Sequence, residues 1–320
     1  MADDQRVDVD RAKALLKRRV LGAMPKAGDY ESGLAGVRMY RRDETTKPQP
    51  CLYQPMIVKM VQGHKRVFIG AEEYRYGEAE VMVTGVDMPG ANMFCEASPD
   101  SPSLTINIDL DRNLLAQLAL EIPYKPFEAG GVVRGMHVQP FDADLLDAYL
   151  RLTGLFNIPE RLPILGPMIV REIHYLLLMG PNGHRLRSFH TAGSQDNHVA
   201  RAILWMKQNL AVTMHIEELA EKVNMAPSTF HRHFKAVTTL SPVQFQKRIR
   251  LYEAQRLMLT QDMDAGSASS AVGYESLSQF TREYKRLFGN PPRKDVTRLR
   301  EEALFARPVA IAGNINPRGF

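Results

Sequence analysis

A six-residue pattern occurs twice in the C-terminal third of this 320-residue chain, with an offset of fifty residues. The first copy is Phe230-His231-Arg232-His233-Phe234-Lys235, and the second is Phe280-Thr281-Arg282-Glu283-Tyr284-Lys285. The correspondence extends to a proline after each copy, Pro242 and Pro292. A solenoid needs at least three copies to bury a continuous core, so two copies favour a paired module.

Each copy predicts two short helices joined by a turn. In the first unit, apolar residues within 216–223 share one helix face, and Phe230 and Phe234 form the inward face of the next helix. In the second unit, Phe280 and Tyr284 take the same inward positions. A helix, a turn and a second helix with a basic outer face make a helix-turn-helix, whose second helix enters the DNA major groove. The chain is therefore expected to bind DNA.

The outward side chains of these helices are the expected DNA contacts. Arg232 and Arg282 can each offer two donors to guanine, while lysines contact phosphates. A helix over residues 242–260 would join the units and span close to ~30 Å, near one turn of B-DNA. The expected contact residues are Ser228, Thr229, His231, Arg232, Lys235, Lys247, Ser278, Gln279, Thr281, Arg282, Lys285 and Arg293.

Charge distribution agrees with a nucleic-acid partner. Residues 199–300 hold 16 Lys and Arg against 9 Asp and Glu, a net of +7, whereas the whole chain is +5. Basicity is thus concentrated in the part that contains the repeat, as a polyphosphate-binding surface requires.

Composition restricts the class of protein. The length and the 44% apolar content allow two or three domains with their own cores. Apolar runs are short, so we expect no membrane-spanning segment, and the acidic start at residues 1–4 does not resemble a signal peptide. Cys51 and Cys95 are the only cysteines, and two free thiols are favoured over a disulfide. These features predict a cytoplasmic protein without a membrane partner.

The N-terminal two-thirds have a different texture. A helix is expected over residues 9–21, and short strands at 56–61, 66–69, 80–84 and 104–108 alternate with Gly and Pro. Residues 72–76 are expected to form a tyrosine-rich turn between two glycines. This pattern suggests a small barrel or sandwich. Helices are expected at 109–120, 142–156 and 164–178, the last two with apolar stripes for the barrel or a partner helix. The polar segment 182–197 is expected to be a linker that few contacts cross.

The repeat resembles the DNA-binding domain of AraC/XylS-type transcription regulators over about 100 residues. The residues that carry this resemblance are Leu219-Ala220, Phe230 to Lys235, Leu240-Ser241-Pro242, Val272-Gly273-Tyr274-Glu275-Ser276-Leu277-Ser278-Gln279-Phe280 and Phe288-Gly289-Asn290-Pro291-Pro292. More loosely, the N-terminal part resembles the cupin-like effector and dimerisation domain of one branch of that family. The matching segments there are Cys51-Leu52-Tyr53, Gln62-Gly63-His64-Lys65 and Tyr74-Arg75-Tyr76-Gly77.

The resemblance implies an α+β fold, in which an N-terminal cupin-like β-barrel with flanking helices precedes an all-α domain with two helix-turn-helix units. The expected divisions are an arm at 1–29, the effector and dimerisation domain at 30–180, a linker at 181–197, the DNA-binding domain at 198–300 and a tail at 301–320. The implied function is sequence-specific transcription regulation, as in an activator, under control of a small-molecule effector. The implied partners are promoter DNA, RNA polymerase, the effector and a second copy of the chain.

Two departures from the family pattern affect the DNA-binding units. Thr239 stands where many members have glycine at a helix C-terminus. Ala265, Ala268 and Ser269 replace bulkier residues, so the first helix of the second unit should be weakly packed.

The expected effector-site residues lie in the β-rich part. They are His64, Tyr74, Tyr76, Met82, Met88, Phe94, Cys51 and Cys95, which could equally form core, and the cysteines could be reactive thiols. His64 has only Glu72 and Glu73 near it in sequence, so no metal site and no cofactor are expected. Two alternatives remain: a cupin enzyme with a helical accessory domain, and an architectural DNA binder without a ligand.

Overall fold

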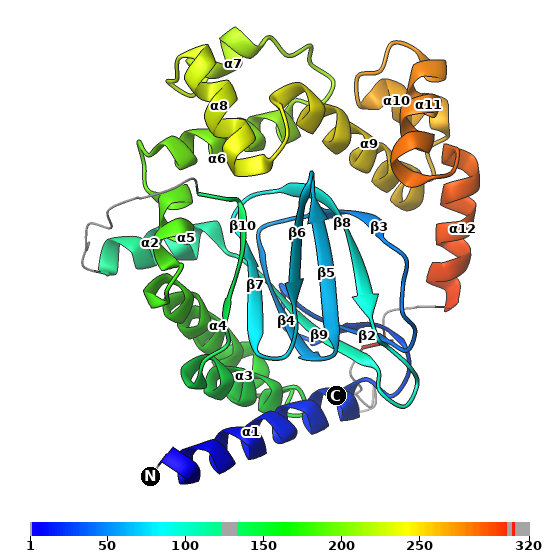
Figure 1. The fold of residues 1–320 in the computed structure, drawn as a ribbon. Coiled ribbons are helices and arrows are strands. Elements are labelled where there is room, and N and C mark those ends of the chain that lie inside the picture. Colours follow the sequence, from blue (N-terminus) through cyan, green and yellow to red (C-terminus); the bar gives the residue numbers. More distant parts are fainter. Residues whose placement is uncertain (1, 123–132, 306–308, 311–320) are drawn as a thin grey trace, which may run out of the picture.

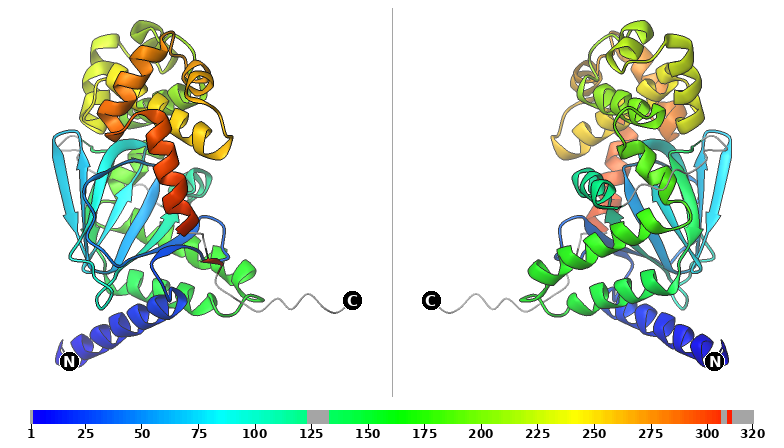
Figure 2. Two further views of the ribbon diagram at one scale, coloured as in Figure 1. Left: turned by 90° about the vertical axis from the view of Figure 1, so that its right-hand side faces the viewer. Right: turned by 90° about the vertical axis from the view of Figure 1, so that its left-hand side faces the viewer.

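The computed structural model describes residues 2–122, 133–305 and 309–310. A β-rich N-terminal part and a helical C-terminal part are stacked on one another, with the first helix at the end opposite the helical part (Figures 1 and 2). The expected α+β class, with strands confined to one part and paired helical units in the other, is confirmed.

Two sheets form the β-rich part. The larger has the order β10-β7-β4-β9-β2-β1-β11, and the smaller has the order β3-β8-β5-β6. The larger sheet contains β1 (Gly28–Glu31), β2 (Val37–Arg42), β4 (Met56–Gln62), β7 (Glu80–Thr84), β9 (Ser103–Asp109), β10 (Met136–Pro140) and β11 (Val309–Ala310). The smaller sheet contains β3 (Gln49–Tyr53), β5 (His64–Ile69), β6 (Glu72–Tyr76) and β8 (Met88–Cys95).

The four predicted strands are confirmed as β4, β5, β7 and β9, whereas the predicted tyrosine-rich turn is wrong. Residues 72–76 form β6, which pairs with β5 in antiparallel register from Lys65 opposite Tyr76 to Ile69 opposite Glu72. The physical reason is the alternation of Glu73 and Arg75 with Tyr74 and Tyr76, which places the tyrosines on one face of a strand.

Helices cover the outer face of the larger sheet. They are α1 (Ala2–Ala23), α2 (Arg112–Glu121), α3 (Ala143–Leu155) and α4 (Leu162–Met179). Ile57, Val81 and Ile106 of the sheet pack in one buried cluster with Leu16 of α1 and Tyr149 of α3. The four helices expected from the N-terminal sequence pattern are therefore confirmed.

Helix α4 corrects one expectation from the sequence. Its 18 residues have a mean hydropathy of 1.4, so by length and composition it is apolar enough to cross a membrane. Gly166, Pro167 and the pair Arg171 and Glu172 interrupt the run, which is why the sequence reads as short apolar segments. One such helix is weak evidence for a membrane, because the core helix of a soluble protein can have the same length and apolar composition. Ile173 and Leu177 of α4 are buried in the core.

The helical part contains seven described helices. They are α6 (Gln195–Gln208), α7 (Ile216–Lys222), α8 (Pro227–Thr238), α9 (Pro242–Thr260), α10 (Ala265–Ala271), α11 (Leu277–Phe288) and α12 (Pro292–Phe305). Figure 1 shows the α7–α8 pair and the α10–α11 pair at opposite ends of α9. Helix α12 runs back alongside the β-rich part, and β11 beyond it pairs with β1.

The segment expected to be a linker is structured. It contains α5 (Gly183–His190) and the start of α6, and Leu186 and Phe189 of α5 are buried. These two apolar residues lie three positions apart among polar ones, so the helix buries only a narrow face and the sequence reads as polar.

One hydrophobic cluster crosses the boundary between the two parts. It contains Met60, Met82 and Met88 from the space between the sheets together with Phe230 and Phe234 of the first repeat unit. The second unit has a separate cluster around Phe280 and Tyr284. The expectation that few contacts cross the boundary is therefore wrong for the first unit.

Polar contacts reinforce this junction. Asp87, which is completely buried, pairs with Lys207 of α6 at 2.6 Å and with Arg112 of α2 at 3.5 Å. The Tyr252 hydroxyl of α9 donates to the Gly90 carbonyl of β8 at 3.0 Å. The helical part is thus held on the β-rich part by ion pairs, hydrogen bonds and apolar packing.

Candidate DNA interface and effector site

The first helix-turn-helix follows from local sequence preferences. Asn224 has the left-handed conformation (φ +59°) in the turn, and Pro227 occupies the first turn of α8. Phe230 and Phe234 are fully buried with ring centroids 5.4 Å apart, and Phe234 makes an edge contact with Phe245 of α9. The predicted inward face is confirmed.

The second unit repeats this geometry. Gly273 takes the left-handed conformation in the turn (φ +83°), and the Ser276 hydroxyl caps α11 by accepting from the Gln279 amide. Phe280 and Tyr284 are fully buried, 5.5 Å apart between ring centroids, and the Tyr284 hydroxyl donates to Asp295.

Most of the expected DNA contacts lie on the outer faces of α8 and α11. Arg232 and Arg282 occupy equivalent positions, and both are exposed. Ser228, His231, Lys235, Ser278, Gln279, Lys285 and Arg293 are also exposed, whereas Thr229 and Thr281 are half-buried. Within the described part of the chain, no carboxylate lies within ion-pair distance of Arg232, Lys235, Arg282, Lys285 or Arg293.

Lys247 and Gln279 have an intramolecular partner in Glu283. This carboxylate is 8% exposed and accepts from Lys247 at 3.3 Å, Gln279 at 3.3 Å and the Tyr274 hydroxyl at 2.9 Å. Burial raises the pKa of Glu283, but the hydrogen bonds from Tyr274 and Gln279 outweigh it, so the pKa lies below its usual value. The repeat did not predict this role for the carboxylate, because the equivalent position in the first unit is His233.

A basic cavity of about 420 Å³ lies between α9 and α11. Besides Lys247, it is lined by Arg248 and Arg286, which the sequence pattern did not single out as contacts. Their positions near the junction of the two units would suit a DNA phosphate.

The β-rich part caps the end of the first recognition helix. The Gly135 amide donates to the Val237 carbonyl at 3.0 Å, and Arg134 donates to the Ala236 carbonyl. The last carbonyls of a helix have no partner within it, so donors from the other part complete the C-terminus of α8. Arg134 also pairs with Glu72 of β6, which fixes its position.

Thr239, the departure from glycine, occupies the left-handed position after α8 (φ +62°). A β-branched residue is strained there. Its side chain packs against Gly70 in the turn between β5 and β6, where no side chain larger than hydrogen fits. The residue that departs from the family pattern is thus part of the contact with the β-rich part.

The structure separates the expected effector residues into two groups. Tyr76, Met82, Met88 and Phe94 are buried between the sheets, and Cys51 and Tyr74 pack against them. His64 and Cys95 are paired across β5 and β8 and lie on the outer side of the smaller sheet. Burial raises the pKa of the Cys51 thiol, which disfavours a reactive thiolate.

The buried polar groups between the sheets include two residues that sequence reasoning missed, Tyr53 and Lys65. Lys65 is 6% exposed, and its ammonium lies 4.7 Å from the Phe94 ring centroid. Burial lowers the pKa of Lys65 to about 8. The Tyr76 hydroxyl is buried without a hydrogen-bond partner in the described chain, whereas the Tyr53 hydroxyl is buried beside Cys51 and Asn92. The available sequence signal was the alternation along β5, which places Lys65 on the same strand face as the apolar residues Val67 and Ile69.

Metal-binding clusters are missing from the described residues, where no group of three His, Cys, Asp or Glu side chains is arranged to hold an ion. A carboxylate oxygen of Glu96 lies 3.9 Å from His64 Nδ1.

Comparison with known proteins gives matches to both parts of the chain. Residues 33–185 match the model of the AraC-type transcriptional regulator N-terminus, and residues 219–298 match a helix-turn-helix domain model. The HTH-type transcriptional regulator ExsA of Pseudomonas aeruginosa is 29% identical over 133 residues, covering 42% of this chain and 48% of ExsA. The HTH-type transcriptional activator RhaS of Pectobacterium carotovorum is 26% identical over 117 residues, covering 37% and 40%. The chain thus matches less than half the length of these curated relatives.

Solved structures extend the likeness to both parts together. Unsaturated fatty acid bound ToxT from Vibrio cholerae superposes with a TM-score of 0.56 over 85% of this chain and 95% of ToxT, at 9% identity. At that identity the match establishes a shared fold.

Proposed function

Because the chain belongs to the AraC family of transcription regulators, we propose that it binds promoter DNA sequence-specifically through α8 and α11 under control of a small-molecule effector. This family consists of transcription regulators rather than enzymes. The proposal extends to cytoplasmic action and to contact with RNA polymerase at the promoter, as the resemblance to activators implies.

One observation carries the DNA-binding proposal. Arg232 and Arg282 are exposed and unpaired within the described residues, and they occupy matching positions on two helices at opposite ends of α9. The 19 residues of α9 span about 28 Å at ~1.5 Å per residue, near one turn of DNA. Both helices could therefore enter successive major grooves, where each arginine can bind a guanine through two hydrogen bonds.

The test is fluorescence anisotropy on DNA fragments selected by the full-length protein from genomic DNA. Arg232→Ala should cost about 1–3 kcal/mol on a selected site and relax preference at one or two base pairs. Arg201→Ala, at an exposed position of α6 outside both units, is the matched control and should leave the affinity unchanged. Unchanged binding by Arg232→Ala would refute the placement of α8 in the groove.

We propose that the effector binds between the two sheets through an acidic group. The support is a buried lysine, Lys65, opposite a buried tyrosine whose hydroxyl has no described partner, Tyr76. An unpaired buried hydroxyl costs free energy, and an anionic ligand would accept from it and offset the buried charge of Lys65. The fatty acid bound to ToxT gives a first candidate class for this chain.

A thermal-shift experiment with oleate tests this effector site. Oleate should raise the midpoint of the wild-type protein, and the shift should disappear in Lys65→Met, which keeps the length and apolar character of the side chain. The control is His64→Ala, one residue away on the outer side of β5, which should retain the shift. Equal shifts in both variants would exclude Lys65 from the site.

We further propose a homodimer formed through α4. Ile164, Met168, Tyr175 and Met179 are 69%, 64%, 42% and 53% exposed and recur on one helix face. Burying such a stripe against a second copy is favourable. Met168→Glu should convert the protein to a monomer in analytical ultracentrifugation, whereas Leu204→Glu, an exposed apolar position on α6, should not. A dimer that tolerates Met168→Glu would contradict this interface.

A further inference from the structure

A second cavity lies outside the space between the sheets, where α1 crosses the larger sheet. It measures about 180 Å³ and is lined by Lys13, Ala14, Leu16 and Lys17 of α1, Lys59 and Val61 of β4, Glu78 and Phe141. Lys59 follows Ile57 on the face covered by helices, opposite to the face of Val58 and Met60. This cavity is therefore separate from the site proposed for the effector.

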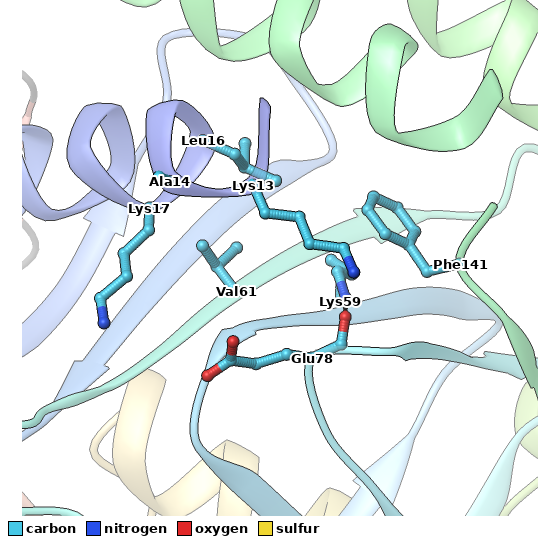
Figure 3. Close-up of a pocket in the computed structure, with 8 residues that line it drawn as sticks. All are labelled: Lys13, Ala14, Leu16, Lys17, Lys59, Val61, Glu78 and Phe141. Carbon is cyan, nitrogen blue, oxygen red and sulfur yellow. Dashed lines mark hydrogen bonds between the residues drawn. The ribbon is translucent and has the colours of Figure 1, made fainter. Parts of the chain in front are cut away.

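The cavity has an excess of positive charge. Three lysines line it together with one acidic residue, Glu78. The Glu78 side chain accepts from the Gly63 amide at 3.2 Å, and among the described residues neither Lys13 nor Lys17 has a carboxylate within ion-pair distance. Figure 3 shows the Lys13 side chain reaching toward the Lys59 amine beside Phe141. Bringing two like charges together in this way is unfavourable, and an anion beside them would offset the repulsion.

The burial of Lys59 distinguishes this site from a group of surface lysines. The residue is 2% exposed, and its ammonium donates to the Glu80 carbonyl at 3.2 Å and to the Glu78 carbonyl at 2.5 Å. It also lies 4.0 Å from the Phe141 ring centroid. Burial and the nearby Lys13 charge lower the pKa of Lys59 to about 7, against the opposing effect of Glu78. An anion beside this group would favour its protonated form.

We propose that this cavity binds a small organic carboxylate, with its charged end at the Lys13 and Lys59 amines and its apolar body against Leu16, Val61 and Phe141. The apolar wall distinguishes this ligand from inorganic phosphate, and the small volume suits an organic acid of few carbon atoms rather than a long acyl chain. Because the lining comes from both α1 and β4, the ligand would fasten α1 to the sheet.

Isothermal titration calorimetry of the full-length protein with benzoate, and separately with inorganic phosphate, tests the proposal. Benzoate should bind, and Lys13→Gln/Lys17→Gln should raise its Kd at least about tenfold, as loss of charge-assisted hydrogen bonds implies. The control Arg11→Gln/Arg18→Gln removes the same charge from exposed positions of α1 outside the cavity and should change the Kd less than about twofold.

A second readout locates the ligand. Benzoate should slow amide hydrogen exchange in α1, and Lys59→Met should abolish this protection while Lys65→Met leaves it intact. Absence of benzoate binding, binding of phosphate alone, or equal Kd values in the two double variants would each overturn the proposal. Loss of benzoate binding in Lys65→Met but not in Lys59→Met would also overturn it. Failure of the oleate experiment would leave the proposal standing, because oleate tests the separate site between the sheets.

Discussion

Asp87→Asn is the sharpest test of how the helical part is held on the β-rich part. The carboxylate is fully buried and lies 2.6 Å from Lys207 and 3.5 Å from Arg112, so its removal leaves two cations without their counter-charge. Breaking a buried ion pair in this way costs roughly 3–5 kcal/mol. Here the side chains of Lys207 and Arg112 are 32% and 35% exposed and can recover part of their hydration. We therefore expect a loss of about 2–3 kcal/mol in the free energy of unfolding.

Urea unfolding followed by circular dichroism measures this loss, and a double-mutant cycle assigns it. Asp147→Asn is the control, because Asp147 also pairs with an arginine but its side chain is 65% exposed, so about 0.5 kcal/mol or less is expected. Lys207→Met in the Asp87→Asn background should restore stability, because it removes an unpaired cation, with a coupling energy of about 1–3 kcal/mol. If Asp87→Asn is no more destabilising than Asp147→Asn, the buried ion pairs do not hold the two parts together.

Three further predictions concern the DNA contacts, the second unit and the buried lysines. Lys235→Ala should weaken binding to all DNA sequences alike and reduce the slope of log K against log salt by about 1, which anisotropy titrations from low to high salt would check. Without DNA, amides of α10 and α11 should exchange faster than those of α7 and α8, because the second unit has its own small cluster while the first shares the core of the β-rich part; equal protection in exchange mass spectrometry would contradict this. The pKa values of Lys59 and Lys65 are lowered to about 7 and about 8, so between these values and about pH 10 the unfolded chain binds more protons than the folded chain. The free energy of unfolding should therefore gain a rising contribution between pH 7 and 10, and urea titrations of Lys59→Met and Lys65→Met should each show a flatter rise.

The helix-turn-helix units could be predicted because their determinants are local. Aromatic residues four positions apart, such as Phe230 and Phe234, define a buried helix face, and Asn224 and Gly273 suit the left-handed turns that the structure contains. Weak packing was also predicted for α10, and the two residues that this helix buries, Ala268 and Ser269, have small side chains.

The β-rich part was predictable only where strands are rich in β-branched residues. Strands β4, β7 and β9 and the Val67–Ile69 end of β5 meet that condition. Strand β6 contains charged residues and β8 contains Pro89 and Gly90, so neither gave a strand signal. Lys65 was missed because one charged residue on an apolar face reads as solvent exposure. Only the paired sheets show that this face is closed from both sides.

The contact between the two parts could not be predicted, because its partners are distant in sequence. Lys207 and Asp87 are 120 positions apart, and Arg134 is 102 positions from the carbonyl it reaches at Ala236. No periodicity within one segment records such pairs. The polar residues of 181–197 indicated a flexible division, yet the burial of Phe189 against Gly85 makes this segment part of the junction.

This junction limits how an effector could control DNA binding. Residues Arg134 and Gly135 lead into β10, whose neighbour β7 lines the space between the sheets with Met82. The same two residues supply the donors for the last carbonyls of α8. An effector that shifts β10 would therefore change the capping and position of the first recognition helix. Helix α11 is held by other contacts, those of its own Glu283 with Lys247 and Tyr274. A ligand can shift such an equilibrium only by its difference in affinity for the two arrangements. Variants at Arg134 should consequently alter the response to the effector at the first unit's half of the DNA site more than at the second's.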